Sequence, residues 1–306
     1  MLLIFLDGVG VGEDDPRRNP FLSARLPTFE ALLGGVPTLA RPAVSGGFAG
    51  RVGHAAGVDA TLGVEGTPQS GTGQASLLTG RNGAAEFGRH FGPWIPTALR
   101  PAVRDANLLV RARDDGHRVA FANAWPRGWT IETAGRRVAG PPLAALGAGV
   151  LDRHVEHLVS GEALASEIVS DPWIHTLGPP DLPRPTPECA GRILGRVATP
   201  GGVTLFAHFA TDTVGHARDL AAGAAQLERV DTFLAGVLAA LPPAHPIVII
   251  SDHGNLEDVT TGHTRNPALG IVVGGAAPGG EERARRAASA LRSLTDLPDV
   301  VLGLLD

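Results

Sequence analysis

The sequence predicts an α/β protein whose central sheet is mostly parallel and lies between layers of helices. Two observations predict this fold class. Short runs such as residues 2–6 and 203–209 are apolar without alternation, as strands buried on both faces are. These runs alternate with helical segments that end at glycine or proline. The 306 residues suffice for one elaborated α/β domain, or for a core with a small second domain.

The first half of the chain begins with a buried strand at residues 2–6, which runs into a glycine-rich loop at 8–12. Helices are expected at 27–33, 70–78 and 99–115. Gly116 ends the last of these before a strand at 117–123. Residues 35–69 are rich in glycine, proline and alanine and show few periodic signals.

Regular α/β patterning returns in the last third of the chain. Strands are expected at 203–209, 246–251 and 268–273, and helices at 218–241 and 281–294. The helix at 218–241 repeats leucine every seven residues, which places one apolar stripe along its length. That stripe is expected to pack on the sheet.

Residues 125–187 interrupt this pattern with clustered prolines and one helical segment at 163–169. We expect a small inserted cap or lid here, so that residues 1–124 and 188–306 form the core. A long surface excursion is the alternative. We call residues 125–187 the predicted cap.

Composition excludes several functions. The net charge of −5 gives no reason to expect nucleic-acid binding. Cys189 is the only cysteine, which excludes an intrachain disulfide and a thiolate zinc cluster. The chain has no lysine, so Schiff-base catalysis and a P-loop lysine are excluded and any cationic contact to a substrate must come from arginine. The N-terminal apolar run is too short for a signal peptide or a membrane span, and we expect a cytoplasmic enzyme without membrane contact.

Three aspartates, Asp7, Asp212 and Asp252, each follow a predicted strand. In parallel sheets, sites form at the carboxyl ends of strands, so these side chains are expected to converge. Histidines accompany them. They are His216, four residues after Asp212; His253, next to Asp252; and His263, ten residues later. Together they suffice to bind two divalent cations, and oxygen and nitrogen ligands without thiolate suit Mn²⁺ or Zn²⁺.

Ser70 stands at the start of a predicted helix, where serine is ordinarily an N-cap. The same position suits a nucleophile, because the positive end of a helix stabilises an alkoxide or a bound phosphate. A neighbouring metal ion would also lower the pKa of the hydroxyl. Thr72 and Ser76 are alternatives close by.

These motifs as a set resemble the alkaline phosphatase superfamily of metalloenzymes, and within it the branch of cofactor-independent phosphoglycerate mutase and phosphopentomutase. The run from Ser70 to Arg81 is also similar to the sulfatase nucleophile helix. The matching blocks are residues 7–12, 69–73, 212–216, 251–255 and 263–267.

The resemblance implies an alkaline phosphatase-like sheet with an inserted cap, and two metal sites. One site would use Asp7, Ser70, Asp252 and His253, and the other Asp212, His216 and His263. It further implies a phosphatase or phosphomutase that transfers the phosphoryl group of a small phosphorylated metabolite through a Ser70 phosphoenzyme. The alternatives are a sulfatase or phosphonate-type hydrolase on the same scaffold, and a non-catalytic metal-binding protein.

The chain departs from the two mutases in three ways. It is shorter, it has Gln74 where they carry histidine, and its predicted cap is small and unmatched. Substrate-binding residues therefore cannot be assigned from the resemblance, and the short insert favours hydrolysis over a mutase reaction. By charge alone the candidates are Arg89, Arg127, Arg136, Arg137 and Arg184.

Overall fold

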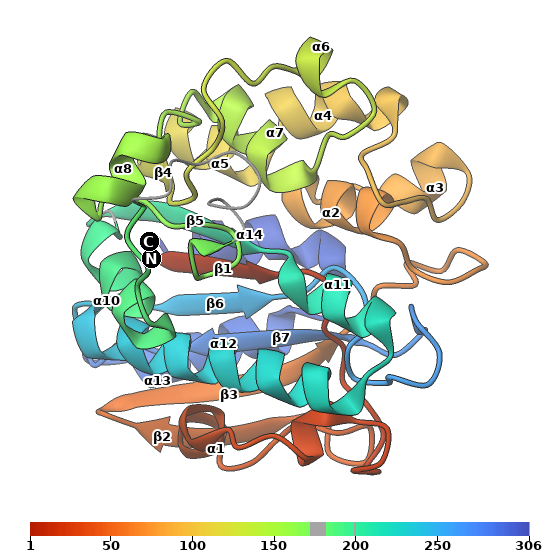
Figure 1. The fold of residues 1–306 in the computed structure, drawn as a ribbon, viewed down its shortest axis with the longest axis vertical. Helices are drawn as coiled ribbons and strands as arrows, with labels where there is room; N and C mark the ends of the chain where they lie inside the picture. The colour runs from red at the N-terminus through yellow and green to blue at the C-terminus, as the bar shows by residue number, and fades with distance from the viewer. Residues whose placement is uncertain (172–181, 199, 306) are drawn as a thin grey trace.

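The computed structural model describes residues 1–171, 182–198 and 200–305. In these residues seven strands form one sheet with the order β2-β3-β7-β6-β1-β5-β4 (Figure 1). Strands β4, β5, β1 and β6 are parallel, whereas β7 is antiparallel to both β6 and β3, and β2 is antiparallel to β3. The strands are β1 (Leu2–Leu6), β2 (Val44–Phe48), β3 (Arg51–Val58), β4 (Arg118–Phe121), β5 (Gly202–His208), β6 (Ile247–Ile250) and β7 (Ala268–Val273). The predicted fold class is confirmed.

Strand β1 shows why the central strands are apolar without alternation. Leu2, Ile4 and Leu6 belong to the hydrophobic cluster on one face of the sheet. Leu3 and Phe5 belong to the cluster on the other face. Because successive side chains point to opposite faces and both faces are covered, every position along the strand must be apolar.

Helices cover both faces of the sheet. In Figure 1, α10 and α12 lie in front of it. One face is covered by α1 (Pro27–Leu33), α10 (Pro187–Val197) and α12 (Leu220–Ala240). The other face is covered by α2 (Ser70–Thr79), α4 (Arg100–Asp105), α5 (Leu108–Asp114), α7 (Gly140–Ala148), α13 (Gly280–Ala290) and α14 (Leu297–Gly303). Shorter elements are α3 (Gly83–Phe87), α6 (Ile131–Ala134), α8 (Val155–Ser160), α11 (Ala210–Ala217) and the 3-10 turns η1 (Pro20–Leu22), η2 (Thr97–Leu99) and η3 (Leu294–Asp296).

The structure corrects several sequence predictions. Residues 35–69 contain the hairpin β2–β3, although its glycine-rich sequence shows no strand pattern; its order comes from pairing with β7. The helix predicted at 99–115 is two helices, because Asn107 caps α5 by accepting hydrogen bonds from Leu109 and Val110. The helix predicted at 281–294 ends at Ala290, where the Asp296 carboxylate accepts from the backbone of the following turn.

The helix predicted at 163–169 is wrong. Leu164 instead donates to the carbonyl of Ala122, and its own carbonyl accepts from the amide of Ala124. The backbone groups that a helix would have used are therefore committed to the segment that follows β4.

The predicted cap is structurally mixed. Its helix α7 packs on α2, α4 and α5 in the main core, while α8 contributes to a small separate cluster that includes Leu158 and Leu182. Part of the predicted cap, residues 172–181, lies outside the described residues. The division between core and cap stays a prediction. None of the helices in the described part of the chain is long and apolar enough to cross a membrane.

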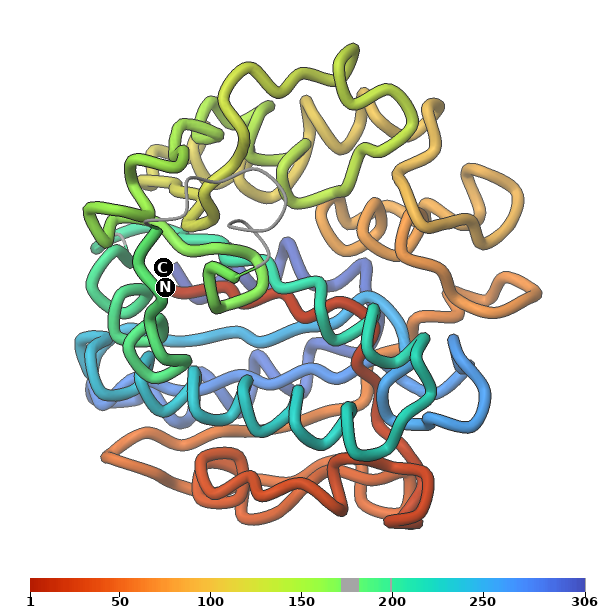
Figure 2. Tube along the Cα trace, viewed as in Figure 1, coloured from red at the N-terminus to blue at the C-terminus, as the bar shows by residue number. Residues whose placement is uncertain are grey.

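The parallel strands direct their carboxyl ends to one edge of the sheet. Figure 2 shows the segments that follow β1, β5 and β6 gathering at this edge, although they are far apart in the sequence. The arrangement matches the position expected for a site in an open α/β sheet.

Arg51 lies at the side of the sheet opposite this edge, where it connects strand β3 to the segment that follows α12. It lies on β3, is only 2% exposed, and donates to the carbonyls of Leu241, Pro242 and His245 at 3.0, 2.7 and 2.6 Å. These carbonyls follow the C-terminus of α12, where a positive charge is favourable. The guanidinium therefore stabilises the C-terminus of α12 and links this helix to strand β3 of the sheet.

Replacing Arg51 by leucine should lower the free energy of unfolding by about 2–3 kcal/mol, because three carbonyls, one of them buried, lose their donor. Urea denaturation measures this change. The exposed Arg118→Leu is the matched control and should stay within about 0.5 kcal/mol of the parent protein. Equal effects of the two substitutions would contradict the role given to Arg51.

Candidate metal centre

The predicted convergence of three aspartates occurs at the carboxyl edge of the sheet. Asp7 directly follows β1, Asp212 lies in the first turns of α11 after β5, and Asp252 follows β6. Backbone contacts fix their approach: Thr211 donates its hydroxyl to the Asp7 carbonyl at 2.6 Å, and the amide of Gly8 donates to Asp252 Oδ1 at 3.2 Å. The strands thus deliver their carboxylates to one place.

Asp7, Asp252 and His253 form the first ligand cluster. One potential ligand atom from each lies within 4.8 Å of the others. The Nε2 of His253 is 3.4 Å from Asp7 Oδ1 and 3.7 Å from Asp252 Oδ1. Ser70 Oγ lies 2.9 Å from the same nitrogen, so the serine belongs to this cluster. All four side chains are buried.

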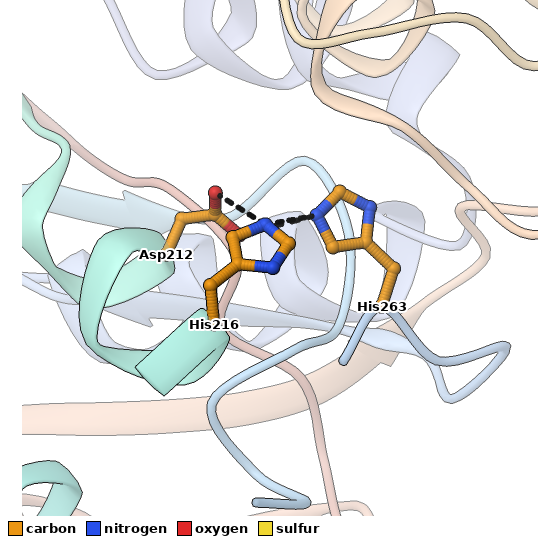
Figure 3. Close-up of side chains that lie close together, drawn as sticks. All are labelled: Asp212, His216 and His263. Atoms are coloured by element: carbon orange, nitrogen blue, oxygen red, sulfur yellow. Dashed lines mark hydrogen bonds and ion pairs between the residues drawn. The ribbon is translucent and has the colours of Figure 1, made fainter. Parts of the chain in front are cut away.

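Asp212, His216 and His263 form the second ligand cluster (Figure 3). His216 Nε2 lies 3.3 Å from Asp212 Oδ2, as the four-residue spacing on α11 predicts. His263 Nε2 lies 3.4 Å from Asp212 Oδ1 and 3.0 Å from His216 Nε2. Three ligand atoms of this kind, from one helix and one loop, face a common point.

The two clusters are adjacent. The rings of His253 and His263 stack with their centroids 4.1 Å apart. Each ring belongs to a different cluster, so two bound ions would be neighbours. Neighbouring ions can bind both the attacking and the leaving oxygen of one reacting group.

The donor chemistry of both clusters fits divalent cations. His263 Nδ1 lies 3.0 Å from the carbonyl of Pro68, a contact that orients the ring with Nε2 toward the second cluster as a potential ligand atom. Asp7 Oδ1 is buried and accepts no hydrogen bond. Burial, followed by the charge of Asp252, raises the pKa of Asp7 well above its usual range. A cation would satisfy the unpaired oxygen and offset the repulsion.

Neighbouring groups have opposite effects on two other ligands. Burial would lower the pKa of His253, but Asp252 and Asp7 outweigh it and raise the pKa to about 10. Burial would raise the pKa of Asp212, but the hydrogen bond from His263 and the charge of His253 lower it to about 2. In the metal-free protein His253 therefore carries a proton at neutral pH.

Gln74 orients the first cluster. Its amide nitrogen donates to Asp7 Oδ2 at 3.4 Å and to Asp252 Oδ2 at 3.2 Å. Its oxygen accepts from the amide of Gly140 at 2.9 Å. The glutamine thus holds two carboxylates together and ties them to the start of α7.

Glu257 is a site residue that the sequence reasoning missed. It is fully buried and accepts from the amides of Gly10 and Asn255 at 2.9 and 2.7 Å. It also accepts from the side chains of Thr264 and Asn266. One carboxylate therefore holds the loops that carry Asp7, Asp252 and His263. The sequence feature that could have indicated it is its position two residues after Asn255, since residues 251–264 contain no arginine that could pair with this acid.

Ser70 is the hydroxyl that faces the ligands. It is the first residue of α2, and Gln69 occupies the N-cap position. The hydroxyl of Thr72 instead accepts from the amide of Phe91, and that of Ser76 bonds the Thr72 carbonyl and the Gly83 amide. Of the three candidate hydroxyls, those of Thr72 and Ser76 are thus committed to the scaffold.

Gly71 permits the close packing beside Ser70. A Cβ at this position would lie 2.1 Å from the carbonyl oxygen of Trp94 and 2.7 Å from that of Phe91. Any side chain here would separate the start of α2 from residues 91–94.

A pocket of about 370 Å³ opens above Ser70. Its floor includes Asp7, Ser70, Gln74 and Asp212. Its other lining residues are Pro93, Trp94, Trp125, Arg137, Ala139, Phe209 and Thr213.

Of the five arginines selected by charge, Arg137 is the one that lines this pocket. Arg127 pairs with Glu156 and Arg184 pairs with Asp171. Arg89 lies over the rings of Phe87 and Phe91. Arg136 is exposed and does not line the pocket.

Comparison with known proteins agrees with this geometry. Residues 202–296 match the family described as the metalloenzyme superfamily. The chain aligns over 99% of its length with the PH0037 protein of Pyrococcus horikoshii, covering 96% of that chain (TM-score 0.51, 13% identity). It aligns over its whole length with all of a cold-active alkaline phosphatase from Shewanella sp. (TM-score 0.50, 11% identity). The C-terminal part of the chain thus matches the metalloenzyme superfamily, and the chain has an alkaline phosphatase-like fold.

Its sequence also resembles one particular branch. It is 32% identical over 235 residues to a phosphopentomutase of Methylobacterium radiotolerans. The match covers 73% of this chain and 56% of the relative, so the chain spans a little over half the relative's length. The resemblance predicted from the motifs is confirmed, and the superfamily implies divalent metal ions.

Replacing Glu257 by glutamine should weaken metal binding about tenfold or more, because the loops bearing three ligands lose their shared acceptor. The free energy of unfolding should fall by about 2–4 kcal/mol, since an amide cannot accept from all four donors. Metal titration and urea denaturation measure the two effects. The exposed Glu188→Gln is the control and should change neither; unchanged metal affinity in Glu257→Gln would rule out the positioning role.

Metal binding should release protons. Because the pKa of His253 is about 10 in the metal-free protein, an ion at its Nε2 must displace a proton at any lower pH. The apparent affinity should therefore weaken about tenfold for each unit that the pH falls between 9 and 6. Calorimetry in two buffers of different ionisation enthalpy counts the protons released. An affinity independent of pH would show that His253 is not a ligand.

Proposed function

We propose that this chain is a two-metal phosphoryl-transfer enzyme with Ser70 as its nucleophile. Asp7, Ser70, Asp252 and His253 would hold one ion, and Asp212, His216 and His263 the other. The observation that carries the proposal is the buried Ser70 hydroxyl, 2.9 Å from His253 Nε2 in the first ligand cluster.

The chemistry follows from these positions. Bound divalent cations, Mn²⁺ or Zn²⁺, would supply a lowered hydroxyl pKa at Ser70 and offset charge on the phosphoryl oxygens. Ser70 gives up its hydroxyl proton to solvent, and its Oγ forms a bond to phosphorus as the bond from phosphorus to the leaving alcohol breaks. The leaving alkoxide takes a proton from solvent. The start of α2 stabilises the negative charge that collects there. Water then attacks the phosphoserine and releases inorganic phosphate.

Hydrolysis is the outcome that we propose, with transfer back to a rearranged substrate as the second candidate. The small predicted cap supports hydrolysis, because a mutase must exclude water while the intermediate waits. The phosphopentomutase relative supports the mutase. Phosphate formed in ¹⁸O-labelled water separates them, since only hydrolysis incorporates the label.

The substrate that we propose is a small phosphorylated metabolite. The pocket of about 370 Å³ has room for a small molecule, and the net charge of −5 gives no attraction for nucleic acid. Residues 125–187 are proposed to act as the cap, since Trp125, Arg137 and Ala139 line the pocket.

Two other functions make different predictions. A sulfatase or phosphonate-type hydrolase on this scaffold would modify Ser70 to an aldehyde or prefer those esters, which mass spectrometry and a substrate panel detect. A non-catalytic metal-binding protein would melt at a higher temperature with metal yet turn over no ester.

Substituting Ser70 by alanine should lower kcat for a simple phosphomonoester about 10³-fold or more, because of the three candidate hydroxyls only that of Ser70 lies beside His253, while those of Thr72 and Ser76 bond the scaffold. Steady-state assays with Mn²⁺ or Zn²⁺ measure this loss, and acid quenching of the parent enzyme should trap phosphate on Ser70. The control Ser76→Ala, on the same helix, should lose about 1 kcal/mol of stability but keep its turnover. Full turnover by Ser70→Ala would exclude it as the nucleophile.

A further inference from the structure

We propose that the pocket selects monoesters whose alcohol is a flat, apolar ring with no second anionic group. This inference rests on the proposed function and names the substrate class of the same site. It starts from the pocket walls above Ser70, where Trp94, Trp125 and Phe209 stand beside Pro93 and Ala139.

Two of the aromatic walls are held from behind. Trp125 packs edge to face on Trp129, with centroids 6.0 Å apart, and Phe209 packs edge on against Phe5 at 6.1 Å. Rings fixed in this way form a surface before a ligand arrives, so little side-chain entropy is lost on binding.

Trp94 forms a wall that is left open to solvent. It is 36% exposed, one of few large apolar side chains so exposed in the described residues. Its backbone lies against Gly71, which places it next to the nucleophile. An apolar ring bound here would remove tryptophan surface from water, which favours binding.

The lining offers few groups that could bind hydroxyls of a leaving alcohol. Gln74 is already committed to Asp7, Asp252 and the Gly140 amide. Thr213 makes no side-chain hydrogen bond within the described residues, and the buried indole N–H of Trp125 has no partner there, so these two groups are free to bind a ligand. A sugar with three or more hydroxyls would therefore place some of them against aromatic walls without partners, which is unfavourable.

Charge argues in the same direction. Arg137 is the one arginine among the lining residues, and it has no ion pair within the described part of the chain. A single guanidinium suits one phosphoryl group. A second phosphate or a carboxylate on the substrate would find no further cationic side chain in this lining.

The test compares benzyl phosphate with ribose 5-phosphate on the metal-loaded protein. Both release a primary alcohol, so the difference in kcat/KM reports the walls more than leaving-group reactivity. We expect benzyl phosphate to be favoured about tenfold or more. In a second arm, intrinsic tryptophan fluorescence should show benzylphosphonate binding about tenfold tighter than methylphosphonate.

Variants locate the effect. Trp125→Leu should reduce both the kcat/KM preference and the phosphonate affinity preference to near unity. If this variant does not fold, Trp94→Leu, at a more exposed position, provides the same test. Phe48→Leu, an exposed aromatic residue on the edge strand β2, is the matched control and should keep the preferences.

The outcomes separate this inference from the proposed function. Equal kcat/KM values, or a preference for ribose 5-phosphate, overturn the inference and leave phosphoryl transfer intact. Tighter binding of benzylphosphonate without turnover of either ester supports the selective pocket and overturns the proposed enzyme. A preference that persists in both tryptophan variants overturns the role of the walls.

Discussion

The structure depends on bringing the carboxylates of Asp7, Asp212 and Asp252 into one largely buried region. Their mutual repulsion and the loss of water oppose this arrangement. The parallel strands enforce it, because β1, β5 and β6 lie side by side and end at the same edge. Amide donors from Gln74 and Asn255 and the imidazoles of both clusters compensate in part. One oxygen of the Asp7 carboxylate still accepts no hydrogen bond, and a bound cation would satisfy it.

Around these three carboxylates, different parts of the fold perform three separate tasks. The sheet sets where the acids emerge, the Glu257 carboxylate sets how the loops sit, and the aromatic walls shape what can approach. Each task is performed by residues from distant parts of the chain. The candidate ligands alone would therefore determine the chemistry without determining the substrate. Proteins with one fold can accordingly share a set of metal ligands and differ in the pocket walls.

The sequence was sufficient for the parts of the molecule with strong local signals. Strands β1 and β7 were predicted with their bounds, and β5 and β6 within one residue at each end, because strands buried on both faces are continuous apolar runs. The convergence of the three aspartates could be predicted, since each of them follows such a strand. The hairpin β2–β3 could not, because its glycines carry no pattern and its order comes from pairing with β7. Glu257 was missed because nothing local shows that an acid will accept hydrogen bonds from three loops. Nothing in sequence separates Arg137 from Arg127, which only the pocket distinguishes.

Gly71 has a consequence for anyone who would redesign this pocket. The turn that presents Trp94 rests directly on the backbone that presents Ser70, with no side chain between them. Rebuilding that turn would shift the reactive oxygen along with the wall. New selectivity is better sought at the opposite rim, around Trp125, where the supporting contacts run to Trp129 and Phe121 and leave the serine in place.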